Sequence, residues 1–280
     1  GGFRHVYYAQ TDSGKQVSLK YPRENPEIEV RGIGHLMNPR SPYLITIYDV
    51  RRNTTGDPFV IMEYVSGPSL RELMTAEPAG FSAPKAAFFL KGIAKGLSYL
   101  HERGIVHRDL KPANIFYDDG YVKIGDYGLS KHISVSQHSG QTVSVGTVHY
   151  MAPEIGSGSY TKAIDIYALG VLLYEILTGQ TPFESETLRN AGTDELRRMI
   201  REVDPPRPSA RVSTLQANAL STASDCRKVE SRKLSQQLRG DLDWIVMKAL
   251  EKDRNRRYES ASHFAADVHR YLNDEPVQAC

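Results

Sequence analysis

The sequence predicts an α+β fold, with short strands in the first part of the chain and helices in most of the rest. Three short runs with strand-forming composition, residues 17–20, 44–50 and 59–62, are separated by turn-rich stretches. Further on, apolar residues recur at helical spacing, as at Phe89 and Ile93. A chain of 280 residues can bury a sizeable core, as one large domain or two modest ones.

Serine and aspartate residues mark where several of the predicted helices begin. Ser69 is followed three residues later by Glu72, which is the pattern of a capping box. Ser82 and Asp241 precede longer stretches of helical periodicity, and we expect them to cap those helices.

The bulk composition excludes several classes of partner. A net charge of +2 favours no polyanionic partner, and we interpret the basic run 252–257 as a solvated loop, so we expect no nucleic-acid binding. The two cysteines, Cys226 and Cys280, form no zinc or disulfide framework, which indicates a reducing compartment such as the cytoplasm. Neither a membrane span nor a signal peptide is evident. We expect a cytoplasmic domain excised from a longer protein, whose other segments could anchor it to a membrane.

A polar loop followed by a predicted hairpin gathers the most chemically informative residues. Residues 115–117 and 121–124 are the two strands, with turn residues between them. In an antiparallel hairpin, the residue before the first strand lies beside the residue after the second. Asn114 and Asp126 should therefore approach each other and offer oxygen ligands suited to Mg²⁺. Asp109, five residues before Asn114, would then lie near the metal and accept a proton.

The chain carries, in order, His-Arg-Asp-Leu-Lys-Pro-Ala-Asn at 107–114, Asp-Tyr-Gly at 126–128 and Ala-Pro-Glu at 152–154. This ordered series resembles the eukaryotic-like serine/threonine protein kinases. The stretches 144–154 and 242–253 look most like bacterial members of that family. The resemblance implies a two-lobed fold with ATP bound between the lobes. The small lobe, 1–65, would hold a small antiparallel sheet and lack its first strand, and the larger, mainly helical lobe would span 66–280.

The resemblance also implies a nucleotide site in the small lobe, built from a glycine-rich loop, a strand lysine and a hinge. Arg4 stands where the family has its third glycine, and Ser18 stands where the family usually has alanine. The hinge residues would meet adenine through their backbone, so their side chains carry little information. The implied nucleotide-binding residues are Gly1, Gly2, Val6, Ser18, Lys20, Met62, Glu63 and Val65.

The implied phosphate-binding lysine, Lys20, needs a carboxylate partner on the helix that follows it. Glu24, Glu27 and Glu29 are the candidates. Apolar residues stand four and seven positions after Glu29, whereas an arginine stands four positions after Glu27. We favour Glu29 on this periodicity, and the other two acids stay open.

The resemblance assigns the chemistry of phosphoryl transfer to the polar loop and the hairpin. Asn114 and Asp126 would hold Mg²⁺ on ATP, and Lys20 would contact the α and β phosphates. Asp109 would orient a serine or threonine hydroxyl of a protein substrate and accept its proton. Lys111, whose presence is typical of the Ser/Thr branch, would stabilise the transferring phosphoryl group.

The hydroxyl-rich segment 126–154 is the implied activation segment. Kinases with an arginine at the position of Arg108 are commonly switched on by phosphorylation of this segment. We expect a phosphate on Thr142 or Ser144 to pair with Arg108. We expect Thr147 to support Asp109 and Lys111 directly, within the polar loop 107–114 that we call the catalytic loop. Autophosphorylation between two copies would involve a dimer, which the sequence leaves open.

Other residues have implied structural roles. Asp165 would anchor the backbone of the catalytic loop, and Glu154 would pair with Arg257. Tyr127 replaces the usual phenylalanine, so its buried hydroxyl needs a hydrogen-bond partner. The region near 205–240 is rich in proline and small polar residues, and we expect a surface insertion there.

Two functional alternatives accompany the kinase hypothesis. A pseudokinase that only binds nucleotide or protein would account for Arg4 and the missing first strand, but the five central polar residues count against it. A small-molecule phosphotransferase fits poorly, because the long activation segment and the Ala-Pro-Glu motif serve to dock proteins. Incorporation of phosphate from labelled ATP would separate these hypotheses.

Overall fold

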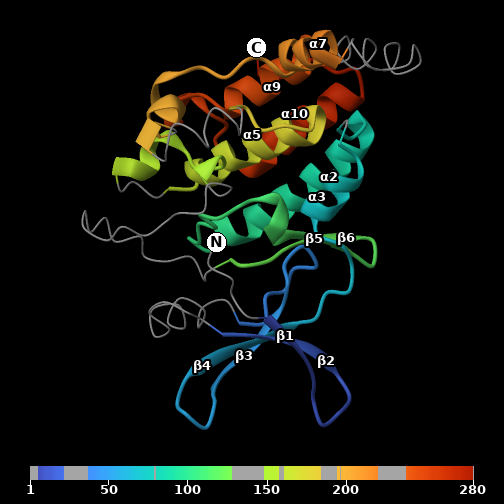
Figure 1. The fold of residues 1–280 in the computed structure, drawn as a ribbon, viewed down its shortest axis with the longest axis vertical. Helices are drawn as coiled ribbons and strands as arrows, with labels where there is room; N and C mark the ends of the chain where they lie inside the picture. Colours follow the sequence, from blue (N-terminus) through green and yellow to red (C-terminus); the bar gives the residue numbers. More distant parts are fainter. Residues whose placement is uncertain are drawn as a thin grey trace.

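The computed structural model describes residues 6–21, 37–78, 80–127, 148–157, 161–183, 194–195, 197–219 and 238–279. Within these ranges the chain forms a small lobe built around a sheet and a larger lobe of helices (Figure 1). The predicted fold class, α+β in two lobes, is therefore confirmed.

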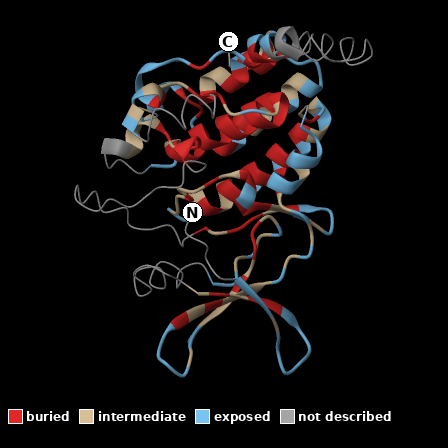
Figure 2. Cartoon of the chain, viewed as in Figure 1, coloured by how far each residue is buried: buried red, intermediate tan, exposed pale blue. Residues whose placement is uncertain are grey.

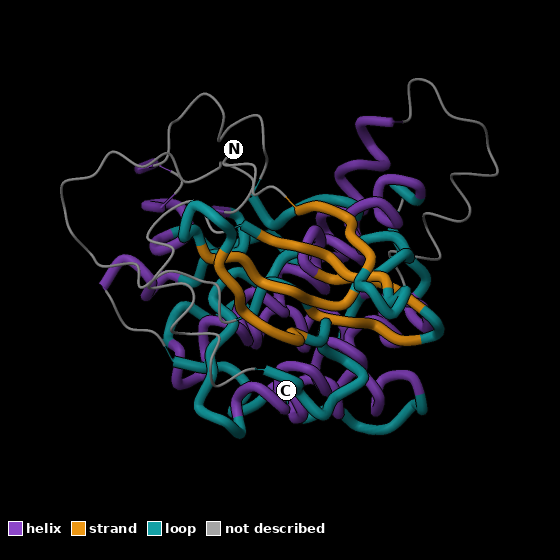
Figure 3. The backbone as a smooth tube through the Cα atoms, turned by 90° about the horizontal axis from the view of Figure 1, so that it is seen from below, coloured by secondary structure: helices purple, strands orange, loops and turns teal. Residues whose placement is uncertain are grey.

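The small lobe is built on a four-stranded antiparallel sheet in the order β1-β2-β4-β3. Register places Lys20 opposite Val60 and Ser18 opposite Met62. With Glu63 at the end of β4, four of the predicted nucleotide residues lie on the two central strands. Seen from below, the sheet lies across the near end of the molecule, with the helices beyond it (Figure 3). The strands are β1 (Val6–Gln10), β2 (Gln16–Lys20), β3 (Ile47–Arg52) and β4 (Pro58–Glu63).

The segment before β3 binds to the large lobe and does not extend the strand, which differs from the predicted strand at 44–50. Leu44 forms a parallel bridge with Ile124 of β6 (Tyr121–Ile124). Ile45 N donates to Ile124 O at 2.9 Å, and Ile124 N donates to Tyr43 O at 2.9 Å. A Cβ on Gly96 would stand 2.8 Å from Tyr43 O, so glycine is needed for this approach. Backbone hydrogen bonds thus join the two lobes.

The large lobe is organised around α5 (Ala163–Thr178), in which every residue from Ile164 to Thr178 is buried. A helix that is apolar on all sides belongs at the centre of a core. Figure 2 shows the buried residues concentrated along α5 and the helix faces turned toward it. No helix in the described part of the chain is long and apolar enough to cross a membrane. The other helices are α2 (Leu70–Ala76), α3 (Ala83–His101), α7 (Pro208–Ala219), α9 (Asp241–Ala249) and α10 (Ala261–Leu272).

The three predicted helix caps have different outcomes. Ser69 and Glu72 form the reciprocal capping box at the start of α2, as predicted. Ser82 occupies the N-cap position of α3, but its side chain makes no capping bond. The prediction for α9 is wrong, because Gly240 is the N-cap and Asp241 is the first helical residue. Asp241 still carries a negative charge at the positive end of the helix dipole.

Helix α7 occupies the first part of the stretch 205–240, where we expect a surface insertion, and several of its residues are buried. Ser209 donates from its backbone N and its Oγ to the two carboxylate oxygens of Asp243, at 3.0 and 2.6 Å. Arg211 and Val212 are buried as well, and Arg211 donates to the carbonyl of Pro182 at 2.9 Å. The polar composition of this stretch is therefore compatible with burial, because its polar groups find partners on other elements. Residues 220–237 lie outside the described residues.

Candidate active site

The hairpin of β5 (Ile115–Asp118) and β6 brings the end of the catalytic loop beside the Asp-Tyr-Gly motif. Ile115 lies opposite Ile124 in the antiparallel ladder. Gly125 N donates to Asn114 O at 2.8 Å, so Asn114 lies against the residue that directly precedes Asp126. The hairpin pattern predicts that Asn114 approaches Asp126, and this bond brings Asn114 to the neighbouring residue.

The catalytic loop brings Asp109, Lys111 and Asn114 into direct contact. Lys111 Nζ lies 3.0 Å from Oδ1 and 2.8 Å from Oδ2 of Asp109. Asn114 Nδ2 donates to the Asp109 carbonyl at 2.8 Å and to its Oδ2 at 3.1 Å. The Asp109 side chain keeps 25% of its surface exposed, so its carboxylate is held in position and still reachable.

A buried carboxylate, Asp165 of α5, fixes the backbone of this loop. Its two oxygens accept from His107 N at 2.8 Å and from Arg108 N at 2.9 Å, and His101 Nε2 lies 2.8 Å from Oδ2. These bonds hold Arg108 at φ 69°, a left-handed backbone conformation that is uncommon for a long side chain. His107 is fully buried, and its Nε2 lies 3.0 Å from Gly125 O, which ties the loop to the hairpin.

Lys20 and Asp126 connect the two lobes at the centre of the site. The Lys20 side chain is almost completely buried, and its ammonium group bonds the Asp126 carboxylate. Asp126 has φ 60°, a conformation that aspartate tolerates better than most residues. Glu29, the predicted partner of Lys20, lies outside the described residues, so that pair stays a prediction.

Tyr127 shows how the chain accommodates a hydroxyl where the family has phenylalanine. The ring is buried, and its hydroxyl donates to the carbonyl of Ile45 in the small lobe. Burial, followed by the negative charge of Glu63, raises the pKa of Tyr127 far above the ordinary tyrosine value. The prediction that this hydroxyl needs a partner is confirmed, and the partner adds another contact between the lobes.

The remaining predicted nucleotide residues line the small lobe and its connection to the large lobe. Val6 lies on β1 opposite Lys20 and is about half exposed. Ser18 is buried, and Glu63 and Val65 are partly buried where β4 runs into the connection. Gly1 and Gly2 lie outside the described residues.

Two predicted structural residues, Glu154 and Arg257, form a bidentate ion pair in the large lobe. Arg257 donates to Oε1 and Oε2 of Glu154 at 2.7 and 2.8 Å. The same guanidinium donates to the carbonyls of Ala163, Glu251 and Lys252, at 3.0, 2.7 and 3.2 Å. The start of α5 and residues 251–257 are thereby tied to the Ala-Pro-Glu motif.

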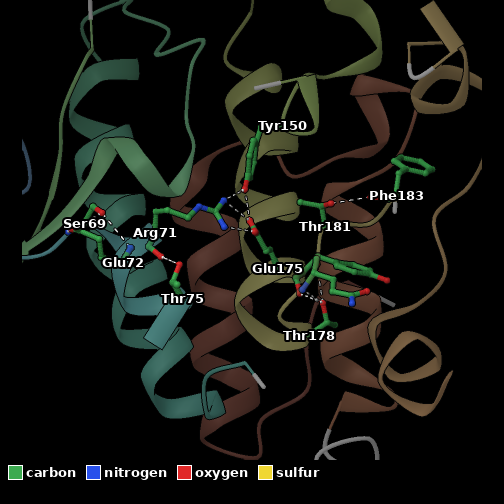
Figure 4. A network of polar contacts seen from close by, with 11 residues as sticks. Ser69, Arg71, Glu72, Thr75, Tyr150, Glu175, Thr178, Thr181 and Phe183 are labelled. Carbon is green, nitrogen blue, oxygen red and sulfur yellow. Dashed lines mark hydrogen bonds and ion pairs between the residues drawn. The ribbon is translucent and has the colours of Figure 1, made fainter. Parts of the chain in front are cut away.

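Sequence reasoning missed a second arginine–glutamate cluster near the same motif. Arg71 of α2 donates to Glu175 Oε1 at 2.7 Å and to the Tyr150 hydroxyl at 2.7 Å, and Tyr150 donates to Glu175 (Figure 4). Burial, then Glu175, raises the pKa of Tyr150 far above its usual range. A signal was available, because Glu175 stands in the same all-buried helix as Asp165, and an acid there needs donors.

The donor chemistry at the hairpin mouth fits Mg²⁺. Asn114 uses its amide nitrogen for both bonds to Asp109, which leaves its oxygen as the atom able to bind a metal. The carboxylate of Asp126 follows immediately after Gly125. Mg²⁺ needs few protein ligands, because it keeps waters and shares substrate phosphates. Among the described residues no group of three or more His, Cys, Asp or Glu side chains could hold a metal.

The predicted regulatory residues are mostly outside the described ranges. Thr142, Ser144 and Thr147 all lie there, so the proposed phosphorylation sites and the supporting role of Thr147 stay predictions. Arg108 is described and partly buried next to Asp109.

Comparison with known families agrees with this geometry. The family model for the protein kinase domain matches residues 1–267. The chain belongs to the protein kinase family. The two relatives described next both carry the name serine/threonine-protein kinase.

Individual relatives are bacterial serine/threonine-protein kinases. The kinase domain is 35% identical over 246 residues to PknB of Mycobacterium tuberculosis, covering 85% of this chain and 34% of PknB. It is 30% identical over 297 residues to a probable serine/threonine-protein kinase of Streptomyces coelicolor, covering 100% of this chain and 39% of that protein. The chain thus spans between a third and two fifths of the length of these relatives.

Solved structures support the fold. The PknI kinase domain of Mycobacterium tuberculosis superposes with a TM-score of 0.66 at 21% identity, covering 96% of this chain and 90% of that one. At this identity the likeness shows a shared fold.

Proposed function

We propose that this domain transfers the γ-phosphoryl group of ATP to serine or threonine hydroxyls of proteins, with Asp109 orienting the hydroxyl and accepting its proton. The observation that carries this proposal is the contact of Asp109 with Lys111 and Asn114, beside the hairpin that leads to Asp126. A base at this position must be both held and reachable, and Asp109 meets both conditions.

The other polar residues support transfer through charge and position. Asn114 and Asp126 would hold Mg²⁺, which when bound neutralises charge on the phosphates. Lys20 is buried, so its positive charge would act on the phosphates in a medium of low dielectric constant. Lys111 already contacts Asp109 and would lie next to the transferring group.

The wider biology of the protein is also proposed. We place the division between the lobes near residue 65, where β4 has ended and α2 has not begun. We propose a cytoplasmic location, autophosphorylation of the 126–154 segment and no nucleic-acid partner. A binding-only scaffold would account for Arg4, but it would not need the contacts of Lys20 with Asp126 and of Asn114 with Asp109.

The test replaces one carboxylate and leaves the fold intact. The domain and its Asp109→Asn variant would be incubated with labelled ATP, Mg²⁺ and a protein substrate. We expect the rate of phosphate incorporation to fall by about 10²- to 10⁴-fold, because the positioned base is lost. Mass spectrometry of the 126–154 segment would locate autophosphorylation.

The matched control is Asp119→Asn, the same substitution at an exposed position in the turn of the same hairpin. Asp119 has φ 48°, which asparagine also tolerates, so this variant should incorporate phosphate at the parent rate. Equal incorporation by the parent and Asp109→Asn would overturn the assigned role of Asp109.

A further inference from the structure

A single lysine on β6 binds two carboxylates that hold the ends of the connecting segment, residues 64–69 between β4 and α2. Lys123 Nζ lies 2.5 Å from Glu63 Oε1, at the end of β4, and 3.4 Å from Asp118 Oδ2, at the end of β5. Glu63 directly precedes the connecting segment, and Asp118 accepts a hydrogen bond from Gly67 N, near its other end, at 3.1 Å. We call Glu63, Lys123 and Asp118 the Lys123 cluster.

Each carboxylate of the cluster uses its second oxygen to hold backbone. Glu63 Oε2 accepts from Thr46 N at 2.9 Å, while its Oε1 faces Lys123. Asp118 Oδ1 accepts from Gly67 N, while its Oδ2 faces the same lysine. A continuous path of polar contacts therefore runs from the small lobe, through Lys123, to the far end of the connection.

The cluster is partly shielded from water. The side chains of Lys123, Glu63 and Asp118 are 12%, 21% and 17% exposed. Burial opposes the charge on Lys123, but its hydrogen bonds and attraction to Glu63 and Asp118 outweigh burial and raise the pKa of the lysine. The lysine is thus charged at neutral pH. Its charge-assisted hydrogen bonds to the two carboxylates are therefore stronger than those of an ion pair exposed on the surface.

Close packing holds the far end of the connection against the hairpin. A Cβ on Gly67 would stand 1.9 Å from the carbonyl oxygen of Tyr117, so no other residue fits there without movement. Tyr117 N also donates to Pro68 O at 3.0 Å. The connection is therefore bound to β5 by backbone contacts and to β6 by Lys123.

The alternation of side chains along β6 explains why Lys123 lies on the face that contacts the connecting segment. Val122 and Ile124 are buried, so Lys123 between them lies on the opposite face of β6. The same strand leads through Gly125 into Asp126. The position of β6 consequently fixes where Lys123 meets the connecting segment and where the Asp126 carboxylate, proposed to bind the metal, lies.

We propose that Lys123 is a positioning residue for the nucleotide: with Glu63 and Asp118 it sets the connecting segment at a fixed distance from the strand that leads into Asp126. The groups that contact the adenine end of ATP and those that contact its phosphate end are then held in their relative positions before ATP binds. Pre-organisation of this kind strengthens binding by lowering the ordering cost. This inference deepens the proposed function and depends on its nucleotide site.

The experiment compares Lys123→Met, Glu63→Gln and the double variant. Methionine keeps an unbranched apolar chain, and glutamine keeps an oxygen for Thr46 N. We expect each single variant to raise the KM for ATP by about tenfold, equivalent to about 1.4 kcal/mol of lost binding, with kcat changed by less than about twofold. The double variant should resemble the single variants, because the pair acts as one unit. Lys123→Arg should retain most of the ATP affinity.

The matched control is Arg51→Gln. Arg51 pairs with Asp49 at 2.8 Å within β3, and both side chains are well exposed. Within the described ranges neither side chain bonds to the large lobe. This control should leave the KM for ATP unchanged. Melting temperatures of all variants would establish that each one folds.

A direct titration with a fluorescent ADP analogue separates this inference from the proposed function. Phosphate incorporation by the parent tests the proposed function, whereas the titration reports nucleotide affinity whether or not transfer occurs. Weaker binding by Lys123→Met and Glu63→Gln, with faster hydrogen exchange in residues 63–67, supports the inference. Parent-like affinity in a folded Lys123→Met variant, or additive losses in the double variant, would overturn it.

Discussion

Two arginine–glutamate pairs hold residues 148–157, one through Glu154 and one through Tyr150, and they differ in which partner is buried. In the Arg257–Glu154 pair the arginine side chain is fully buried and the glutamate is 12% exposed. In the Arg71–Glu175 pair the glutamate is 6% exposed, whereas the arginine is 44% exposed. The first pair is enclosed by protein on both sides, and the second keeps one partner in water.

This difference determines what each pair does for the fold. Three backbone carbonyls share the Arg257 guanidinium with Glu154, so its loss would leave several buried acceptors without donors. Arg71 and the Tyr150 hydroxyl instead both donate to Glu175. Because Arg71 is half-exposed, water can replace some of the hydrogen bonds that are lost when this pair is broken. The cost of breaking a pair therefore depends on the charge that stays buried afterwards.

The largest expected effect comes from Arg257→Met. We expect the free energy of unfolding to fall by about 3–5 kcal/mol, because Glu154 and the carbonyls lose their donors inside the protein. Urea unfolding would measure this loss. The neighbouring Arg256→Met is the control, because Arg256 is 70% exposed and lies 3.4 Å from Glu251, an exposed pair worth about 0–1 kcal/mol. Similar losses in both variants would contradict the comparison.

An intermediate effect is expected from Arg71→Leu, measured in the same way. This change leaves the buried Glu175 carboxylate with the Tyr150 hydroxyl as its remaining described donor, at a cost of about 2–3 kcal/mol. Glu175→Gln should cost less, about 1 kcal/mol, because the half-exposed Arg71 can be hydrated. A larger loss of unfolding free energy in Glu175→Gln than in Arg71→Leu would show that solvent access to the remaining partner does not decide this loss.

Tyr150→Phe removes one hydroxyl from the second cluster. We expect a loss of about 1 kcal/mol, because Glu175 keeps its bonds to Arg71 and the ring still fills its site. Thermal and urea unfolding of this variant would be compared with Tyr127→Phe, which removes the buried hydroxyl bonded to Ile45. Each hydroxyl has one described acceptor, so the two losses should be similar.

The smallest expected effect concerns pH at His149, which is buried next to the second cluster. Its Nδ1 has no hydrogen-bond partner among the described residues. Burial lowers the pKa of His149, Glu175 raises it and Arg71 lowers it, with a net decrease. The unfolded chain therefore binds this proton more readily, and stability should fall as pH drops below about 6.5. His149→Phe should show a weaker fall than the parent in urea unfolding across that range.

The two clusters also show how far the sequence could predict the site. The Glu154–Arg257 pair, the catalytic loop and the hairpin were predicted, because each belongs to a local pattern or to the resemblance. Glu175 was missed although its setting in α5 matches that of Asp165, and the same requirement for buried acids applies to both. The cap at Asp241 was wrong, and the expectation of a surface insertion near 205–240 did not foresee the burial of Ser209 and Arg211. Local composition does not say which distant groups will satisfy polar residues.

By itself, the sequence determined the α+β division, the hairpin that brings Asn114 toward the Asp126 end of β6, and the loop that carries Asp109. These features depend on contacts between residues close in the chain, which periodicity and turn chemistry encode. Only the tertiary structure decided that Lys123 binds Glu63, 60 residues away, and that Arg71 binds Glu175, 104 residues away. A charged residue has the same local pattern whether it is solvated or paired, so its partner is set by how the lobes and helices pack.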